Sequence, residues 1–307
     1  MGRFITDLKD LFRRGNVLTR FIYVNVAVFV VVELVNVILL LFNRMAPQVF
    51  DLLALPASVT RFLMQPWSIL TYMFMHAGVM HILFNMLWLY WFGQIFLTFF
   101  SAKHFRGVYF LGGILGGLLY MLAYNLFPYF QTTVHHALLV GASASALAIA
   151  TATAYREPNY PIQLLFIGTV RLKYLALFMV LTDLLFMTSG NAGGHISHLG
   201  GALAGLWFAA ALQKGTDLTS WINKGLDAVS GLFEGKTWKR KPKMKIHYGG
   251  KSAAGQQNRS ANKADFKVYN AREEEEKINR ILEKVKQSGY ESLTQDEKKT
   301  LFDASRK

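Results

Sequence analysis

Apolar stretches that are long and almost free of charge recur through the first two-thirds of the chain. A helix needs about 20 mostly apolar residues to span a bilayer, and it satisfies its backbone hydrogen bonds within itself. Arg171 and Lys173 interrupt one stretch, so we place them at the cytoplasmic mouth of a span and residues 162–169 in a loop at the interface. The pattern predicts six membrane spans, at 19–42, 80–99, 107–128, 137–155, 172–189 and 195–213.

The basic residues outside these spans indicate the orientation of the bundle. With six spans, almost all of them fall on one side of the membrane, and only Arg44 and Arg61 lie on the other. Lysine and arginine gather on the cytoplasmic side of membrane proteins. We therefore predict an all-α integral membrane protein, a six-transmembrane-helix bundle with a cytoplasmic C-terminal tail and both termini cytoplasmic, in the cytoplasmic membrane of a bacterium.

The chain divides into four predicted regions. Residues 1–17 place apolar and basic positions at helical spacing, as in a cytoplasmic amphipathic helix on an anionic membrane surface or an ordinary solvated turn. Residues 18–213 form the membrane domain, whose apolar, proline-interrupted loop at 43–79 favours short amphipathic helices partly submerged in the outer side of the bilayer. A basic cytoplasmic linker at 214–263 and a small charged helical hairpin at 264–307 follow.

The hairpin is too small to be more than marginally stable by itself. Apolar residues recur at helical spacing from Ile278 to Val285, Gly289 ends that helix, and residues 292–301 predict a second one. The hairpin is either a solvated appendage or a docking site for a cytoplasmic partner. Attraction to anionic lipid explains the basic linker with fewer assumptions than nucleic acid does, so we expect no nucleic-acid partner.

Composition agrees with a membrane body. Only 17% of the 307 residues are charged, 52% are apolar, and the mean hydropathy is +0.26. Soluble domains carry about a quarter charged residues, so these values favour lipid and exclude an intrinsically disordered chain. The absence of cysteine excludes disulfides, a cysteine nucleophile and thiolate metal sites.

A few polar side chains lie within the predicted spans, where such residues are costly and are often functional. His81 and Asn85 are four residues apart on one face of the second span. Ser143 and His198 lie near the starts of the fourth and sixth spans. Because these three spans all start near the outer face in the six-span topology, we expect the four side chains to meet at one depth.

These groups suit acyl transfer. A serine hydroxyl becomes a nucleophile when an imidazole takes its proton, and the imidazole then returns that proton to a leaving amine. A serine–histidine dyad suffices, and the second imidazole and the amide suit an oxyanion hole. Gly201 and Gly205 form a small face on the sixth span, which favours close packing against the small residues of the fourth.

Two neighbouring residues compete for these roles. Ser145 projects about 200° around the helix from Ser143, so only one of the two can face His198, and we choose Ser143. His195 precedes His198 by three residues, and the glycines before it predict a loop. We therefore expect His195→Ala to keep more activity than His198→Ala.

Some features of the sequence are also found in other classes of protein. Glu33 and Asp183 are carboxylates within spans, as in a small transporter, but we can name no partner for either. No His-Glu-x-x-His pattern or carboxylate joins the histidines, and no nucleotide-binding glycine loop is present, so we expect no metal and no cofactor. His81 with Asn85 alone is equally typical of a polar clamp between helices.

Three motifs, in the same order on the predicted spans, resemble the rhomboid intramembrane serine proteases. They are His76-Ala-Gly-Val-Met-His81 continuing through Asn85 to Gly93, Gly141-Ala-Ser143, and His198-Leu-Gly-Gly201 continuing to Gly205. The resemblance covers about residues 15–213. It implies a six-helix bundle in the lipid bilayer that cleaves transmembrane segments of single-span or multi-span membrane proteins near the outer face.

By this resemblance Ser143 is the nucleophile, His198 the general base, and His81, Asn85 and the Ser143 backbone amide the oxyanion hole. Four positions depart from the family pattern: Ala144 for glycine, Leu147 for an aromatic residue that stacks on the catalytic histidine, Ser68 for arginine after Trp67, and Leu97 for glutamate. None removes a catalytic group. The alternative within the family is an inactive protein that binds membrane clients without cleaving them.

Overall fold

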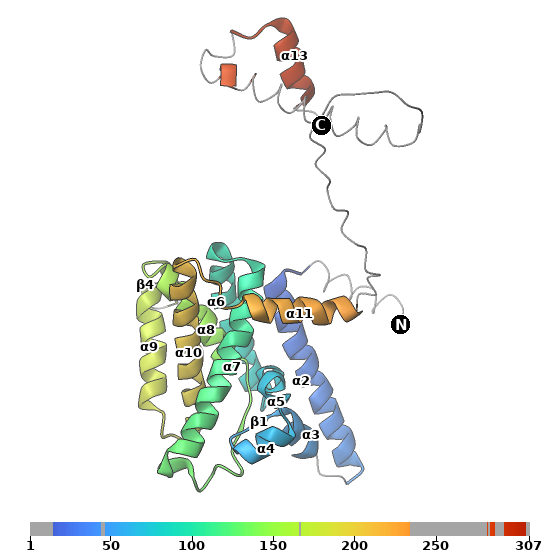
Figure 1. The fold of residues 1–307 in the computed structure, drawn as a ribbon, viewed down its shortest axis with the longest axis vertical. Helices are drawn as coiled ribbons and strands as arrows, with labels where there is room; N and C mark the ends of the chain where they lie inside the picture. Colours follow the sequence, from blue (N-terminus) through green and yellow to red (C-terminus); the bar gives the residue numbers. More distant parts are fainter. Residues whose placement is uncertain are drawn as a thin grey trace, which may run out of the picture. The chain divides into compact units, whose positions relative to one another are not determined.

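The membrane body is a helical bundle, seen in a computed structural model (Figure 1). The structure describes residues 15–43, 47–165, 167–233, 281, 283–285 and 292–304. The chain divides into two compact units, Met1–Lys239 and Arg240–Lys307. The amphipathic segment predicted at 1–17 lies almost wholly outside the described residues.

Six helices correspond to the six predicted spans: α2 (Val17–Leu41), α6 (Val79–Phe99), α7 (Ala102–Leu126), α8 (Ser143–Arg156), α9 (Leu172–Leu185) and α10 (Ala192–Gln213). Within the described residues, four of them, α2, α6, α7 and α10, are long and apolar enough to cross a membrane. Helices α8 and α9 have 14 residues each, below the usual length of a span. The chain is therefore a mostly helical membrane protein, and crossing by α8 and α9 stays a prediction.

Two short strand pairs correct the all-α expectation. Strand β1 (Leu55–Pro56) pairs antiparallel with β2 (Leu138–Leu139). The predicted fourth span at 137–155 therefore begins in extended conformation and becomes helical only at Ser143. Strands β3 (Pro161–Leu164) and β4 (Gly168–Arg171) form a hairpin where the sequence predicted a loop at the interface.

The predicted loop at 43–79 contains short helices, as the sequence indicated. These are α3 (Pro47–Leu53), α4 (Val59–Met64), α5 (Ser68–Thr71) and the 3-10 turn η1 (Tyr72–Phe74). Side chains fasten the loop to itself and to the bundle: the Trp67 indole donates to the Leu52 carbonyl at 2.9 Å, and the Tyr72 hydroxyl donates to the Gly113 carbonyl. The loop thus has a fixed position beside α7.

The centre of the bundle is formed by α7, α8 and α10, packed at very short distances. A Cβ added at Gly201 or Gly205 would collide with the backbone carbonyl of Ala144 or Ala148, respectively. Thr151 on α8 donates across the interface to the Ala202 carbonyl at 3.0 Å. The predicted small-residue face is therefore used, and almost all of α8 is buried.

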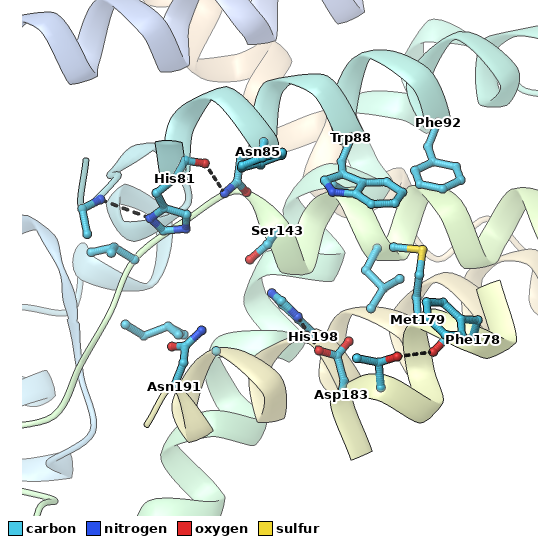
Figure 2. A pocket seen from close by; sticks show the side chains of 18 of the residues that line it. His81, Asn85, Trp88, Phe92, Ser143, Phe178, Met179, Asp183, Asn191 and His198 are labelled. Carbon is cyan, nitrogen blue, oxygen red and sulfur yellow. Dashed lines mark hydrogen bonds and ion pairs between the residues drawn. The ribbon is translucent and has the colours of Figure 1, made fainter. Parts of the chain in front are cut away.

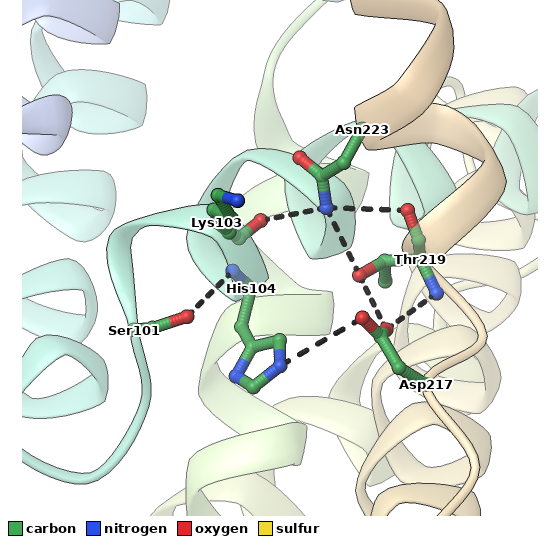
Figure 3. Close-up of polar contacts among 6 residues, drawn as sticks. All are labelled: Ser101, Lys103, His104, Asp217, Thr219 and Asn223. Atoms are coloured by element: carbon green, nitrogen blue, oxygen red, sulfur yellow. Dashed lines mark hydrogen bonds and ion pairs between the residues drawn. The ribbon is translucent and has the colours of Figure 1, made fainter. Parts of the chain in front are cut away.

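A helix lies where the sequence predicted only a basic linker. Helix α11 (Ser220–Phe233) is amphipathic and packs against the start of α7. The Asn223 side-chain amide donates to the Lys103 carbonyl at 3.0 Å (Figure 3). Just before the helix, Asp217 Oδ1 accepts the Thr219 N–H, and Asp217 Oδ2 lies 3.8 Å from His104 Nε2. The prediction of a linker was wrong over 220–233, because the apolar face of this segment packs on α7 and stabilises the helix.

In the second unit, helix α13 (Gln295–Ala304) corresponds to the predicted second helix of the tail. Its start is a capping box, in which the Thr294 hydroxyl accepts from the Glu297 amide and Glu297 accepts from the Thr294 amide. Residues 281 and 283–285 are helical as well, and Lys284 pairs with Glu297 at 2.9 Å. These features fit a small hairpin.

Candidate active site

A cavity of about 770 Å³ lies between α6, α8, α9 and α10. Its lining includes all four residues that the sequence selected for chemistry: His81, Asn85, Ser143 and His198. Figure 2 shows their side chains converging from three helices, with Asp183 of α9 beside them. The tertiary structure therefore brings the predicted set together.

Ser143 is the first residue of α8, and the backbone before it adopts a conformation that requires glycine. Gly141 has φ +126°, a conformation that residues with a side chain rarely adopt. A Cβ there would lie 3.0 Å from His81 Nε2 and 3.5 Å from Ser143 Oγ. The first N–H groups of a helix have no partners within it and form its positive end, so the Ser143 hydroxyl sits where negative charge is stabilised.

The ring of His81 is oriented by the backbone. Its Nδ1 accepts the Ala77 N–H at 3.2 Å, which leaves the ring proton of the neutral imidazole on Nε2, facing the cavity. Asn85 donates one amide hydrogen to the His81 carbonyl at 2.8 Å. A second amide hydrogen of Asn85 remains for another acceptor. Both side chains can therefore donate toward a developing oxyanion.

His198 is held by a carboxylate, a contact that the sequence motifs do not predict. Asp183 Oδ1 lies 2.8 Å from His198 Nδ1, and an ionised carboxylate only accepts, so Nδ1 carries the proton. The other ring nitrogen, Nε2, then has a free lone pair. In Figure 2 the His198 ring lies between Ser143 and Asp183, so this lone pair is on the side of the serine.

His195 shares this carboxylate. It lies within α10, not in the predicted loop, because the helix already begins at Ala192. Its Nδ1 is 2.8 Å from the same Asp183 Oδ1. The expectations that Asp183 has no partner and that no carboxylate joins the histidines were therefore wrong. Asp183 is twelve and fifteen residues away on another helix, so no local spacing revealed the contact.

The competing residues lie elsewhere. The Ser145 side chain is 1% exposed, has no hydrogen-bond partner among the described residues, and does not line the cavity. Glu33, on α2, is also absent from the lining. Ala144 points into the interface with α7 and α10, where its Cβ faces Gly116, so its extra methyl is not in the cavity.

Apart from Thr182 and Asn191, the other described residues that line the cavity are apolar or glycine. Trp88 and Phe92 of α6 face Phe178 and Met179 of α9 across it (Figure 2). Leu147, one turn after Ser143, lines the floor. The cavity thus joins a polar end, where the serine lies, to an aromatic and aliphatic end.

His76, which precedes α6, packs against the ring of His81. Its side chain is buried at 2% exposure, and its ring centroid lies 5.2 Å from that of His81. Burial, and next the neighbouring His81, lower the pKa of His76 to about 4. His76 is therefore neutral at physiological pH.

Comparisons with known proteins agree with this architecture. A family model described as the rhomboid domain matches residues 63–215, and a family of unknown function (DUF6576) matches residues 267–307. The chain is 28% identical over 158 residues to the RHOMBOID-like protein 12, mitochondrial, of Arabidopsis thaliana. That alignment covers 48% of this chain and 47% of the relative, so the match spans about half the length of each. The rhomboid-domain match includes α6 to α10, and together with the similarity to this relative it shows that the chain belongs to the rhomboid family.

Proposed function

We propose that this protein is an intramembrane serine endopeptidase, with Ser143 as nucleophile and His198 as general base. The observation that carries the proposal is the shared cavity: hydroxyl, imidazole, and the His81 and Asn85 donors line one space at the start of α8. Any of these residues alone has a structural explanation. Their convergence from three helices, with the imidazole in the tautomer that can accept a proton, supports catalysis.

The geometry supports a two-step acyl transfer. Ser143 Oγ attacks the carbonyl carbon of the substrate while His198 Nε2 takes the hydroxyl proton. The tetrahedral oxyanion accepts hydrogen bonds from His81 Nε2–H, the Asn85 amide and the Ser143 backbone N–H. The C–N bond then breaks and His198 gives its proton to the leaving amine. Water attacks the acyl-enzyme by the same route and releases the second product.

Asp183 acts in this scheme as a positioning residue. The family's aromatic residue that stacks on the catalytic histidine is replaced here by Leu147, which supplies no face for stacking. The 2.8 Å hydrogen bond that His198 Nδ1–H donates to Asp183 Oδ1 supplies the orientation instead, and the charge of Asp183 stabilises the imidazolium that forms. We therefore extend the predicted dyad to a serine, a histidine and an orienting carboxylate.

The substrate class follows from the cavity wall. An extended peptide that reaches Ser143 between α6 and α9 passes Trp88, Phe92, Phe178 and Met179, all of which favour apolar side chains. Single-span or multi-span membrane proteins supply such peptides. Cleavage takes place near the outer face of the membrane if all six helices cross it with the termini cytoplasmic.

The test uses the purified chain in liposomes with a panel of tagged single-span membrane proteins. We expect cleavage by the wild type and by Ser145→Ala, and loss of at least about 1000-fold in Ser143→Ala and His198→Ala. Ser145→Ala is the matched control because it removes a hydroxyl from the same helix outside the cavity.

Equal cleavage by Ser143→Ala would refute the assignment of the nucleophile. No cleavage by any variant, with equal capture of the same membrane proteins by all of them, would favour the inactive, client-binding alternative.

A further inference from the structure

Two histidines and one carboxylate form a compact group, of which Asp183 and His198 line the cavity. One ligand atom from each of Asp183, His195 and His198 lies within 4.8 Å of the other two. We propose that this group binds a divalent transition-metal ion such as Zn²⁺, and that the bound metal reversibly switches off the proposed peptidase. The metal site stands on the cluster itself, whereas the inhibition rests on the proposed function.

The donor set suits zinc. Two imidazole nitrogens and one carboxylate oxygen are common zinc ligands, and three protein ligands leave one tetrahedral position for water. Zn–N and Zn–O distances of about 2.0–2.1 Å place tetrahedral ligands about 3.3 Å apart. The present Nδ1–Oδ1 distances are both 2.8 Å, so each must lengthen by about half an ångström. The two Nδ1 atoms lie within 4.8 Å of one another and must come to the same spacing.

Access and charge are also favourable. Asp183 and His198 line the cavity, so an ion that enters it reaches two of the three ligands. The His195 and His198 side chains are 20% and 23% exposed, respectively, so neither ring is sealed inside the bundle. Two neutral rings and an ionised carboxylate carry one negative charge. No lysine or arginine is among the described residues that line the cavity, so no cation competes there.

The bound metal blocks catalysis because it coordinates His198 Nδ1, the nitrogen that carries the proton in the metal-free form. In the metal-free form the proton is on His198 Nδ1 and the lone pair on Nε2 faces Ser143. Metal binding needs the lone pair on Nδ1, so the proton moves to Nε2 and the ring stays neutral. Nε2 then donates a hydrogen bond and cannot accept the serine proton. Each molecule is therefore either metal-bound or competent as a base.

The first arm of the test measures binding without activity. The full-length Ser143→Ala protein in detergent is titrated with Co²⁺, whose visible absorption reports a four-coordinate site, and Zn²⁺ is then used to displace it. We expect one bound ion per chain. In the Ser143→Ala background, His195→Gln should weaken binding by at least about tenfold, because it removes one ligand. The matched control replaces the exposed neighbours His135 and His136 with glutamine and should leave binding unchanged.

The second arm measures inhibition. Wild type and His195→Gln cleave a membrane substrate in liposomes while the Zn²⁺ concentration is raised. We expect His195→Gln to retain most cleavage and to need at least about tenfold more Zn²⁺ for half-inhibition, and we expect a chelator to restore the wild type.

The outcomes separate the two proposals. No cobalt spectrum in Ser143→Ala, or binding lost only in the His135 and His136 variant, overturns the metal site. Equal zinc sensitivity of wild type and His195→Gln overturns the inhibitory mechanism. Metal binding that needs His195, together with no cleavage by the wild type, upholds the metal site and contradicts the proposed peptidase.

Discussion

At the scale of single residues, Gly141 leaves room for the proposed oxyanion hole. Its positive φ is strained for any other residue, and a Cβ would press on His81 Nε2 at 3.0 Å. We expect Gly141→Ala to lower kcat at least about 100-fold, because the His81 donor and the Ser143 hydroxyl would move apart. Cleavage assays check this, with circular dichroism to establish folding. A folded Gly141→Ala protein with wild-type kcat would contradict this role.

Asp183 gives a second prediction at this scale. Asp183→Asn presents an amide to His198 Nδ1 and allows the wrong tautomer, so kcat should fall at least about 100-fold with little change in KM. Asp183→Glu keeps the carboxylate and should recover part of kcat. Steady-state kinetics on a membrane substrate separate the two parameters. Equal losses in both variants, accompanied by a lower melting temperature, would indicate a structural role only.

His76 links stability to pH. Its pKa of about 4 lies below the ordinary histidine value of about 6.5, so the unfolded chain binds a proton that the folded chain excludes. Stability is therefore fully present above pH 6.5 and falls as the pH drops toward 4, by about 3 kcal/mol in all. In melting curves of Ser143→Ala protein, His76→Phe should lose less stability than its parent between pH 7 and 4.5. Parallel losses would refute this assignment.

At the scale of elements, the contact of α8 with α10 depends on glycine. The Cβ of Gly201→Ala would meet the backbone of Ala144, which cannot move aside. We expect a loss of about 1–3 kcal/mol in unfolding free energy and a lower melting temperature. Gly225→Ala is the control, because its Cβ meets no atom within 4 Å on α11. It should leave the melting temperature unchanged or raise it. A similar melting temperature for both variants would show that α8 and α10 can separate without cost.

The elements also show the limits of periodicity. Helices α2, α6, α7 and α10 were predictable because a long apolar run has few alternatives to a span. The start of α8 was not, since residues 138–139 are as apolar as a helix yet pair with β1, a strand more than eighty residues earlier. Helix α11 was not predicted, because it directly precedes the basic run that begins at Lys236 and was assigned with it to the linker. Local composition describes such segments poorly when distant contacts decide their conformation.

At the scale of the whole molecule, the cysteine-free chain offers a direct test of orientation. The basic residues Arg106, Arg171 and Lys173 lie where α7 and α9 begin, whereas Arg61 is in α4 at the other end of the bundle (Figure 1). If the basic end is cytoplasmic, Tyr129→Cys should react with an impermeant maleimide on intact bacterial cells. Leu165→Cys, in the β3–β4 turn, should react only after permeabilisation. The reverse pattern would invert the predicted topology.

The C-terminal unit has a helix and a family match of its own. A family model of unknown function covers residues 267–307, and α13 with its capping box shows that a defined helix forms there. A cytoplasmic partner for this unit stays a prediction.

The sequence by itself determined the membrane character, the order of the helices and the choice of Ser143, His198, His81 and Asn85 as the candidate catalytic residues. These follow from hydropathy, from the cost of polar groups in lipid and from motif spacing, all of which are properties of neighbouring positions. Only the tertiary structure decided that Asp183 holds His195 and His198 through one oxygen. That contact joins two helices whose rotation about their axes is fixed by packing, and no single-helix pattern contains the rotation of its neighbour.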